Sequence, residues 1–168
     1  MIDVTRLSQI EFDDVASLPP DCILVVNVED NWTAVVKRKL RSGRVGWSYT
    51  ERVDQLGVVR SILADGAKLH VYDPTLDGTT FESRADIHRV FAVGNDPDAV
   101  GRVIAWTSDS YGRSAAILVS VNPRTYRGSA CAYTSDDSKE SLLVALKGRS
   151  VGVDPAKIKI YKVALGWY

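Results

Sequence analysis

The pattern of apolar and polar residues predicts a helix and then a buried strand near the N-terminus. Ser8 and Glu11 have the spacing of a capping box, which predicts a short helix over Gln9–Ser17. A run of apolar residues follows at Cys22–Val28 (CILVVNV) and ends at turn-prone polar residues, as a strand does. The chain therefore opens with elements of both types.

The next segment, residues 32–49, fits two interpretations. Apolar residues at Trp32, Val35, Val36 and Leu40 could share one face of a helix. The same residues could form two strands, Trp32–Lys39 and Arg44–Tyr49, joined by Ser42-Gly43. Because β-branched residues are frequent here, the hairpin is favoured.

The first half ends with a helix, a strand and a polar loop. Helical periodicity covers Thr50–Asp65, and Lys68–Tyr72 is apolar enough for a strand. Asp73–Ser83 is rich in turn residues and predicts a loop. This loop is the expected boundary between an N-terminal subdomain (residues 1–83) and a C-terminal unit (residues 84–168), unless the chain is one continuous domain.

The second half alternates strands and helices in a recognisable order. The expected elements are a strand at Ile87–Val93, a helix over Val100–Tyr111, strands at Ala115–Val121 and Tyr126–Tyr133, a helix capped by Asp136 or Asp137 that carries Leu142, Leu143 and Leu146, and a strand at Lys157–Leu165. The βαββαβ order is that of a ferredoxin-like plait. The expected fold class is thus α/β (α+β), with a β-meander, a helix and a strand in the N-terminal half.

Short motifs in residues 87–165 resemble the RNA-recognition-motif family. VFAVGN at Val90–Asn95 is similar to that family's first-strand motif, and RGSACAY at Arg127–Tyr133 falls where its second motif lies. The resemblance implies a plait that stacks bases on aromatic side chains of its central strands. Ser129 and Cys131 stand at two of those positions, which leaves Phe91 as the candidate stacking residue.

Composition and charge narrow the possible partners and locations. The 168 residues carry 21 basic and 21 acidic side chains, so no bulk charge attracts nucleic acid or an acidic membrane. The start of the chain does not resemble a signal peptide, and no apolar run is long enough to span a bilayer. We expect a cytoplasmic protein with no membrane contact, no cofactor and no metal, whose two cysteines, Cys22 and Cys131, are buried free thiols.

The leading functional expectation is a non-enzymatic protein that acts through protein–protein contact or self-association, with RNA as a possible partner. It depends on basic residues beside aromatic ones and on an aromatic C-terminus, because such residues are enriched in interfaces and in single-strand binding sites. The candidate residues are Lys37, Arg38, Trp47, Phe91, Arg124, Tyr126, Arg127, Trp167 and Tyr168.

Two alternatives remain open, and both assign the protein a small-molecule or metal-dependent activity. A ribonuclease-H-like nuclease would hold two metal ions with Glu29 or Asp30, Glu51 or Asp54, and Asp73. An oligomeric plait could instead bind a nucleotide-like ligand at a subunit interface, as an enzyme or a sensor.

Overall fold

The computed structural model describes residues 7–39, 41–50, 63–64, 66–72, 80–81, 101–108, 112–117, 131–134, 136–147 and 154–163. One sheet has six strands in the order β1 (Leu7–Ile10), β10 (Ile158–Val163), β2 (Ile23–Val28), β3 (Asn31–Lys39), β4 (Val45–Thr50) and β9 (Cys131–Tyr133). The other has four, in the order β6 (Thr80–Phe81), β5 (Lys68–Val71), β7 (Val103–Ser108) and β8 (Gly112–Ile117). Among the described residues, the helical elements with assigned bounds are η2 (Phe12–Ser17), α3 (Lys139–Lys147) and η4 (Pro155–Lys157), and residues 63–64 are also helical. All of these strand pairs are antiparallel, and the combination with helices agrees with the expected α+β class.

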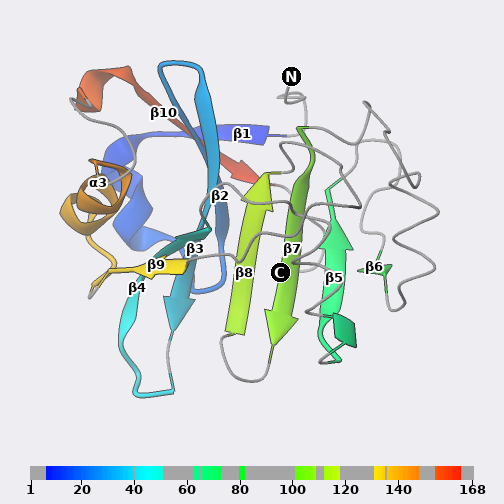
Figure 1. Ribbon diagram of the computed structural model, residues 1–168. Coiled ribbons are helices and arrows are strands. Elements are labelled where there is room, and N and C mark those ends of the chain that lie inside the picture. The colour runs from blue at the N-terminus through cyan, green and yellow to red at the C-terminus, as the bar shows by residue number, and fades with distance from the viewer. Residues whose placement is uncertain are drawn as a thin grey trace.

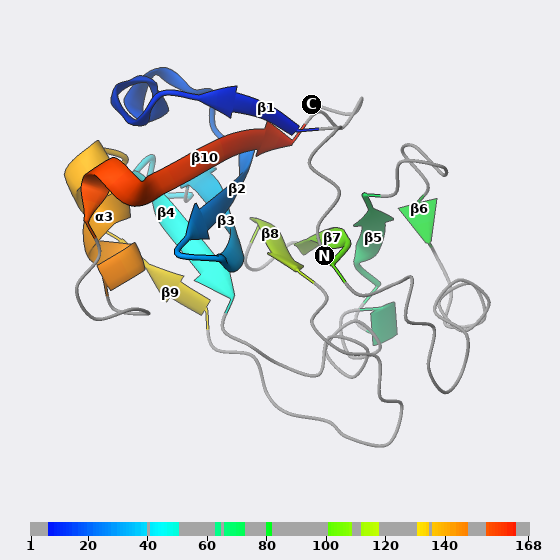
Figure 2. The ribbon, with the colours of Figure 1, turned by 90° about the horizontal axis from the view of Figure 1, so that it is seen from above.

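The six-stranded sheet is the middle layer of three (Figure 1). Because side chains alternate along a strand, the apolar run of β2 buries both of its faces. Leu24 and Val26 pack in one core with α3 and η2, whereas Ile23 and Val25 pack in a second core with residues of the four-stranded sheet. Figure 2 shows α3 and the four-stranded sheet on opposite sides of this middle layer.

The hairpin expectation for residues 32–49 is confirmed, since β3 and β4 pair in antiparallel register. Gly43, in the connecting turn, has a φ of 83°. This left-handed conformation is one that glycine adopts without a steric penalty. The strands expected at Cys22–Val28 and Lys68–Tyr72 are also present, as β2 and β5.

Two predicted helix starts are wrong, although both helices exist. Leu7–Ile10 is a strand that pairs with β10, so the first helix is the 3₁₀ helix η2 and begins only after Glu11, which makes no side-chain cap. In α3 the cap is Ser138, whose Oγ accepts a hydrogen bond from the Ser141 backbone N–H at 3.1 Å. Asp136 instead accepts hydrogen bonds from Ser138 and so supports the capping residue.

The helix predicted over Val100–Tyr111 is wrong, because Val103–Ser108 forms β7. Four consecutive residues, Val103 to Trp106, are buried, as expected for a strand covered on both faces and not for a helix with one apolar stripe. β8 pairs with β7, and β9 pairs with β4 in the other sheet, so the described parts of the strands predicted at Ala115–Val121 and Tyr126–Tyr133 lie in different sheets. These pairings differ from those of a ferredoxin-like plait. The strand predicted at Ile87–Val93 lies outside the described residues.

Both sheets combine strands from the two sides of the boundary expected near residues 83 and 84. β4 pairs with β9 in the larger sheet, and β5 pairs with β7 in the smaller one. The last strand, β10, lies between β1 and β2. In the part of the chain that the structure describes, no helix is long and apolar enough to cross a membrane.

Candidate functional site

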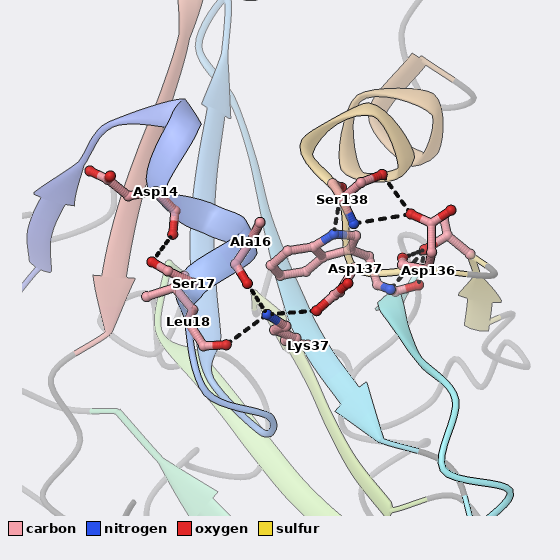
Figure 3. Close-up of polar contacts among 10 residues, drawn as sticks. Asp14, Ala16, Ser17, Leu18, Lys37, Asp136, Asp137 and Ser138 are labelled. Atoms are coloured by element: carbon pink, nitrogen blue, oxygen red, sulfur yellow. Dashed lines mark hydrogen bonds and ion pairs between the residues drawn. The ribbon is translucent and has the colours of Figure 1, made fainter.

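Lys37 lies at the junction of β3, η2 and α3, in the interior of the protein. Its Nζ donates hydrogen bonds to the carbonyl oxygens of Ala16 at 2.8 Å and Leu18 at 2.7 Å, and lies 3.0 Å from Oδ2 of Asp137 (Figure 3). The residue is 2% exposed. Every donor of this ammonium group therefore has an acceptor, as a buried charge requires.

Trp47 joins the same junction from β4. The Lys37 ammonium lies 5.8 Å from the centre of the Trp47 ring, within the range of a cation–π contact. The indole Nε1 donates to the carbonyl oxygen of Ser138 at 3.1 Å, and the Trp47 backbone N–H donates to Thr134 Oγ1 at 2.7 Å. Trp47 is fully buried, and Lys37 is almost so. These two predicted binding residues therefore connect the sheet to the start of α3, and neither reaches the surface.

The predicted basic surface is divided between the two faces of β3. Lys37 points toward the helices, and its neighbour Arg38 points toward the four-stranded sheet, as alternation requires. Arg38 is 7% exposed. The other predicted binding residues lie outside the described part of the chain: Phe91, Arg124, Tyr126, Arg127, Trp167 and Tyr168.

The acidic residues predicted for the nuclease alternative are not brought together in the described residues. Glu29 and Asp30 form the two-residue turn between β2 and β3, with φ values of 48° and 64°. Such a pair of positive φ angles is typical of a type I′ hairpin turn. Glu51, Asp54 and Asp73 are not among the residues that the structure describes.

The strand order also differs from that of a ribonuclease-H-like fold. β2 lies between β10 and β3 in the six-stranded sheet, whereas β5 belongs to the four-stranded sheet. Within the described ranges, no group of three or more acidic, histidine or cysteine side chains is placed to hold a metal ion.

A second feature, which the sequence-based reasoning did not select, is an aromatic pair on the face of the six-stranded sheet. Trp32 in β3 and Tyr161 in β10 have ring centres 5.7 Å apart and planes tilted by 31°. Both rings are half-buried and pack against the core between the sheets. The alternation of Trp32 with the buried residues Ala34 and Val36 could have indicated this face of the strand.

Polar side chains border the aromatic pair at the hairpin end of the sheet. Asn27 is the cross-strand partner of both Trp32 and Lys159, and Lys159 is exposed. At the adjoining turn, Glu29 forms an ion pair with Lys157 at 3.5 Å, in which both side chains are about 60% exposed. The aromatic pair of Trp32 and Tyr161 is thus a partly exposed surface with charges of both signs at its rim.

The buried Cys22 and the half-buried His70 have shifted pKa values, and both shifts are explained by their surroundings. Burial raises the pKa of the Cys22 thiol, with a smaller opposing effect from nearby lysine and arginine charges. Burial lowers the pKa of His70, and the positive charge of Arg113 adds to the shift. Thr80 Oγ1 lies 3.0 Å from Nδ1 of His70 and holds the ring between β5 and β6.

No protein-family model, curated protein or solved structure matches the chain.

Proposed function

We propose that this is a non-enzymatic binding protein that acts by self-association, with Trp32 and Tyr161 at the centre of the contact between two copies. The observation that carries the proposal is the partly buried aromatic pair on the sheet face. Large aromatic residues are enriched at the centres of protein interfaces because they bury much surface at a small cost in conformational entropy.

The charges around the pair favour a second copy of the chain as the partner. An interface with twofold symmetry places one surface patch against itself, so the patch has to be complementary to itself. Acidic Glu29 and basic Lys157 lie together at the hairpin end of this patch, 3.5 Å apart, and basic Lys159 lies on the neighbouring strand position, so one rim offers charges of both signs to a second copy. Since the net charge of the chain is zero, two copies do not repel each other over long distances.

RNA is a weaker candidate than a second copy of the chain. Single-strand binding needs several cations that converge on one accessible surface. Lys37 and Arg38 lie on opposite faces of β3, and both are buried. Lys37 also has three acceptors of its own, so its charge is already compensated.

Sedimentation velocity over a concentration series tests the proposal. We expect wild-type protein to shift from monomer to dimer as its concentration rises, and Trp32→Ser to weaken dimerisation about tenfold or more, as truncation at an interface centre does. The matched control is Val144→Ser on α3, because Val144 is an apolar side chain, 65% exposed, on the opposite side of the sheet. This variant should dimerise like wild type.

A urea unfolding curve for Trp32→Ser separates loss of the contact from loss of the fold. The proposal is overturned if wild type stays monomeric at every concentration, or if a folded Trp32→Ser protein dimerises like wild type. A parallel run with random-sequence RNA covers the alternative partner. A monomer that binds RNA at low salt and releases it at moderate salt would replace self-association with RNA binding, because released counterions cause that dependence.

A further inference from the structure

Strand β1 forms one edge of the six-stranded sheet, and no described strand pairs with its outer side. Figure 2 shows β1 along the margin of that sheet. All of its residues, Leu7–Ile10, pair with β10 on the inner side. In an antiparallel ladder, alternate residues of an edge strand direct their backbone N–H and C=O groups away from the sheet. β1 therefore offers hydrogen-bonding groups to a further strand.

This edge is held in place because β1 packs against both cores of the protein. Leu7 packs against the core between the two sheets, and Ile10 packs against the core that contains residues of α3 and η2. The side chains of Ser8 and Gln9, between them, are exposed. A strand that is already fixed in its extended form loses little conformational entropy when another strand joins it. β1 is thus preorganised for pairing.

β1 also lacks the residues by which proteins commonly protect a sheet edge from pairing, which are charged residues, above all lysine, and proline. Leu7–Ile10 (LSQI) contains none of these, whereas β8, at an edge of the four-stranded sheet, carries Arg113. No side chain of β1 therefore opposes the approach of another strand by its charge.

The exposed residues of β1 favour a second copy of the same strand as the partner. A twofold axis perpendicular to the sheet pairs two antiparallel β1 strands and places either Ser8 or Gln9 opposite its own copy, because opposite residues lie on the same face of a sheet. A serine hydroxyl and a glutamine amide each donate and accept hydrogen bonds, so each is complementary to itself. A charged residue at either position would instead meet a like charge.

We propose that β1 pairs with β1 of a second copy and so continues the six-stranded sheet from one copy into the next. This contact uses the edge of the sheet, whereas the contact around Trp32 and Tyr161 uses its face. The two surfaces are neighbours, because Gln9 is the cross-strand partner of Tyr161. Since so short a strand buries little surface, the edge contact should be the weaker of the two and should join dimers into larger assemblies at higher concentration.

Backbone amide hydrogen exchange over a concentration series, in wild type and in Trp32→Ser, tests the edge contact. We expect exchange within β1 to slow as the concentration of either protein rises, while exchange in η2 stays unchanged, because pairing shields only the edge. Sedimentation velocity of the same samples should show wild type passing beyond the dimer and Trp32→Ser forming a dimer. The Trp32→Ser series isolates the edge contact, since this variant weakens the contact on the face of the sheet.

The double variant Ser8→Lys/Gln9→Lys places like charges across the twofold axis whichever of the two residues lies there, and should weaken the edge contact about tenfold. The matched control is Ser42→Lys/Val144→Lys, which adds the same charge at two exposed positions outside β1 and should associate like wild type.

Exchange within β1 that does not depend on the concentration of wild type would overturn the proposal. So would a folded Ser8→Lys/Gln9→Lys protein that associates as strongly as the Ser42→Lys/Val144→Lys control. Failure of the contact around Trp32 would give a different result, because wild type and Trp32→Ser would then associate equally while exchange within β1 still slowed with concentration.

Discussion

Replacing Lys37 with methionine tests the central structural assignment, that this residue joins β3 to η2 and α3. The variant keeps most of the apolar side chain but removes the ammonium group. It leaves the carbonyl oxygens of Ala16 and Leu18 without their donor, and Asp137 without its counter-ion. We expect the chain to fold with a markedly lower free energy of unfolding.

The expected loss follows from the contacts. A hydrogen bond from a charged donor to a backbone carbonyl is worth about 1.5 kcal/mol or more, so the two bonds contribute about 3 kcal/mol. The ion pair adds at most about 1 kcal/mol, because the Asp137 side chain is 42% exposed and water screens it. Relief from burying a charge offsets part of the total. We therefore predict a net loss of about 2–3 kcal/mol for Lys37→Met.

Urea unfolding followed by far-UV circular dichroism measures this loss. The matched control is Lys39→Met, two residues further along the same strand, where the side chain is exposed. Exposed substitutions of this kind change stability by no more than about 0.5 kcal/mol. If Lys37→Met is as stable as Lys39→Met, the three contacts contribute nothing and the assignment of Lys37 as a structural residue is refuted.

Three further predictions concern titratable groups. In a Cys131→Ser background, the buried Cys22 thiol should react with a thiol reagent far more slowly than in urea-unfolded protein, and equal rates would contradict its burial. Because burial lowers the pKa of His70, the unfolded chain binds the proton more readily, so stability should fall as pH drops below about 6.5. Unfolding curves of wild type and His70→Gln should diverge in that range, and parallel curves would contradict the shift. Hydrogen bonds from Ser138 lower the pKa of Asp136, so a carboxyl NMR titration should place the Asp136 midpoint below the usual aspartate value of about 3.9. A midpoint at or above that value would show that Asp136 does not support the α3 cap.

The sequence by itself was sufficient for elements that short stretches of chain specify. The continuous apolar run of β2, the turn residues between β3 and β4, and the leucines of α3 act within a few residues of one another. Alternation along β3 also required Lys37 and Arg38 to lie on opposite faces of that strand.

Only the tertiary structure decided what lies on each of those faces. Val103–Ser108 became a strand because β5 and β8 supply hydrogen-bond partners on both sides, whereas its apolar spacing fitted a helix equally well. The partners of Lys37 include Asp137, a hundred residues further along the chain. No local pattern of charges indicates that β3 is covered by α3 on one face and by β8 on the other. That packing turns one basic neighbour into a structural residue and leaves the other, Arg38, without a described acceptor.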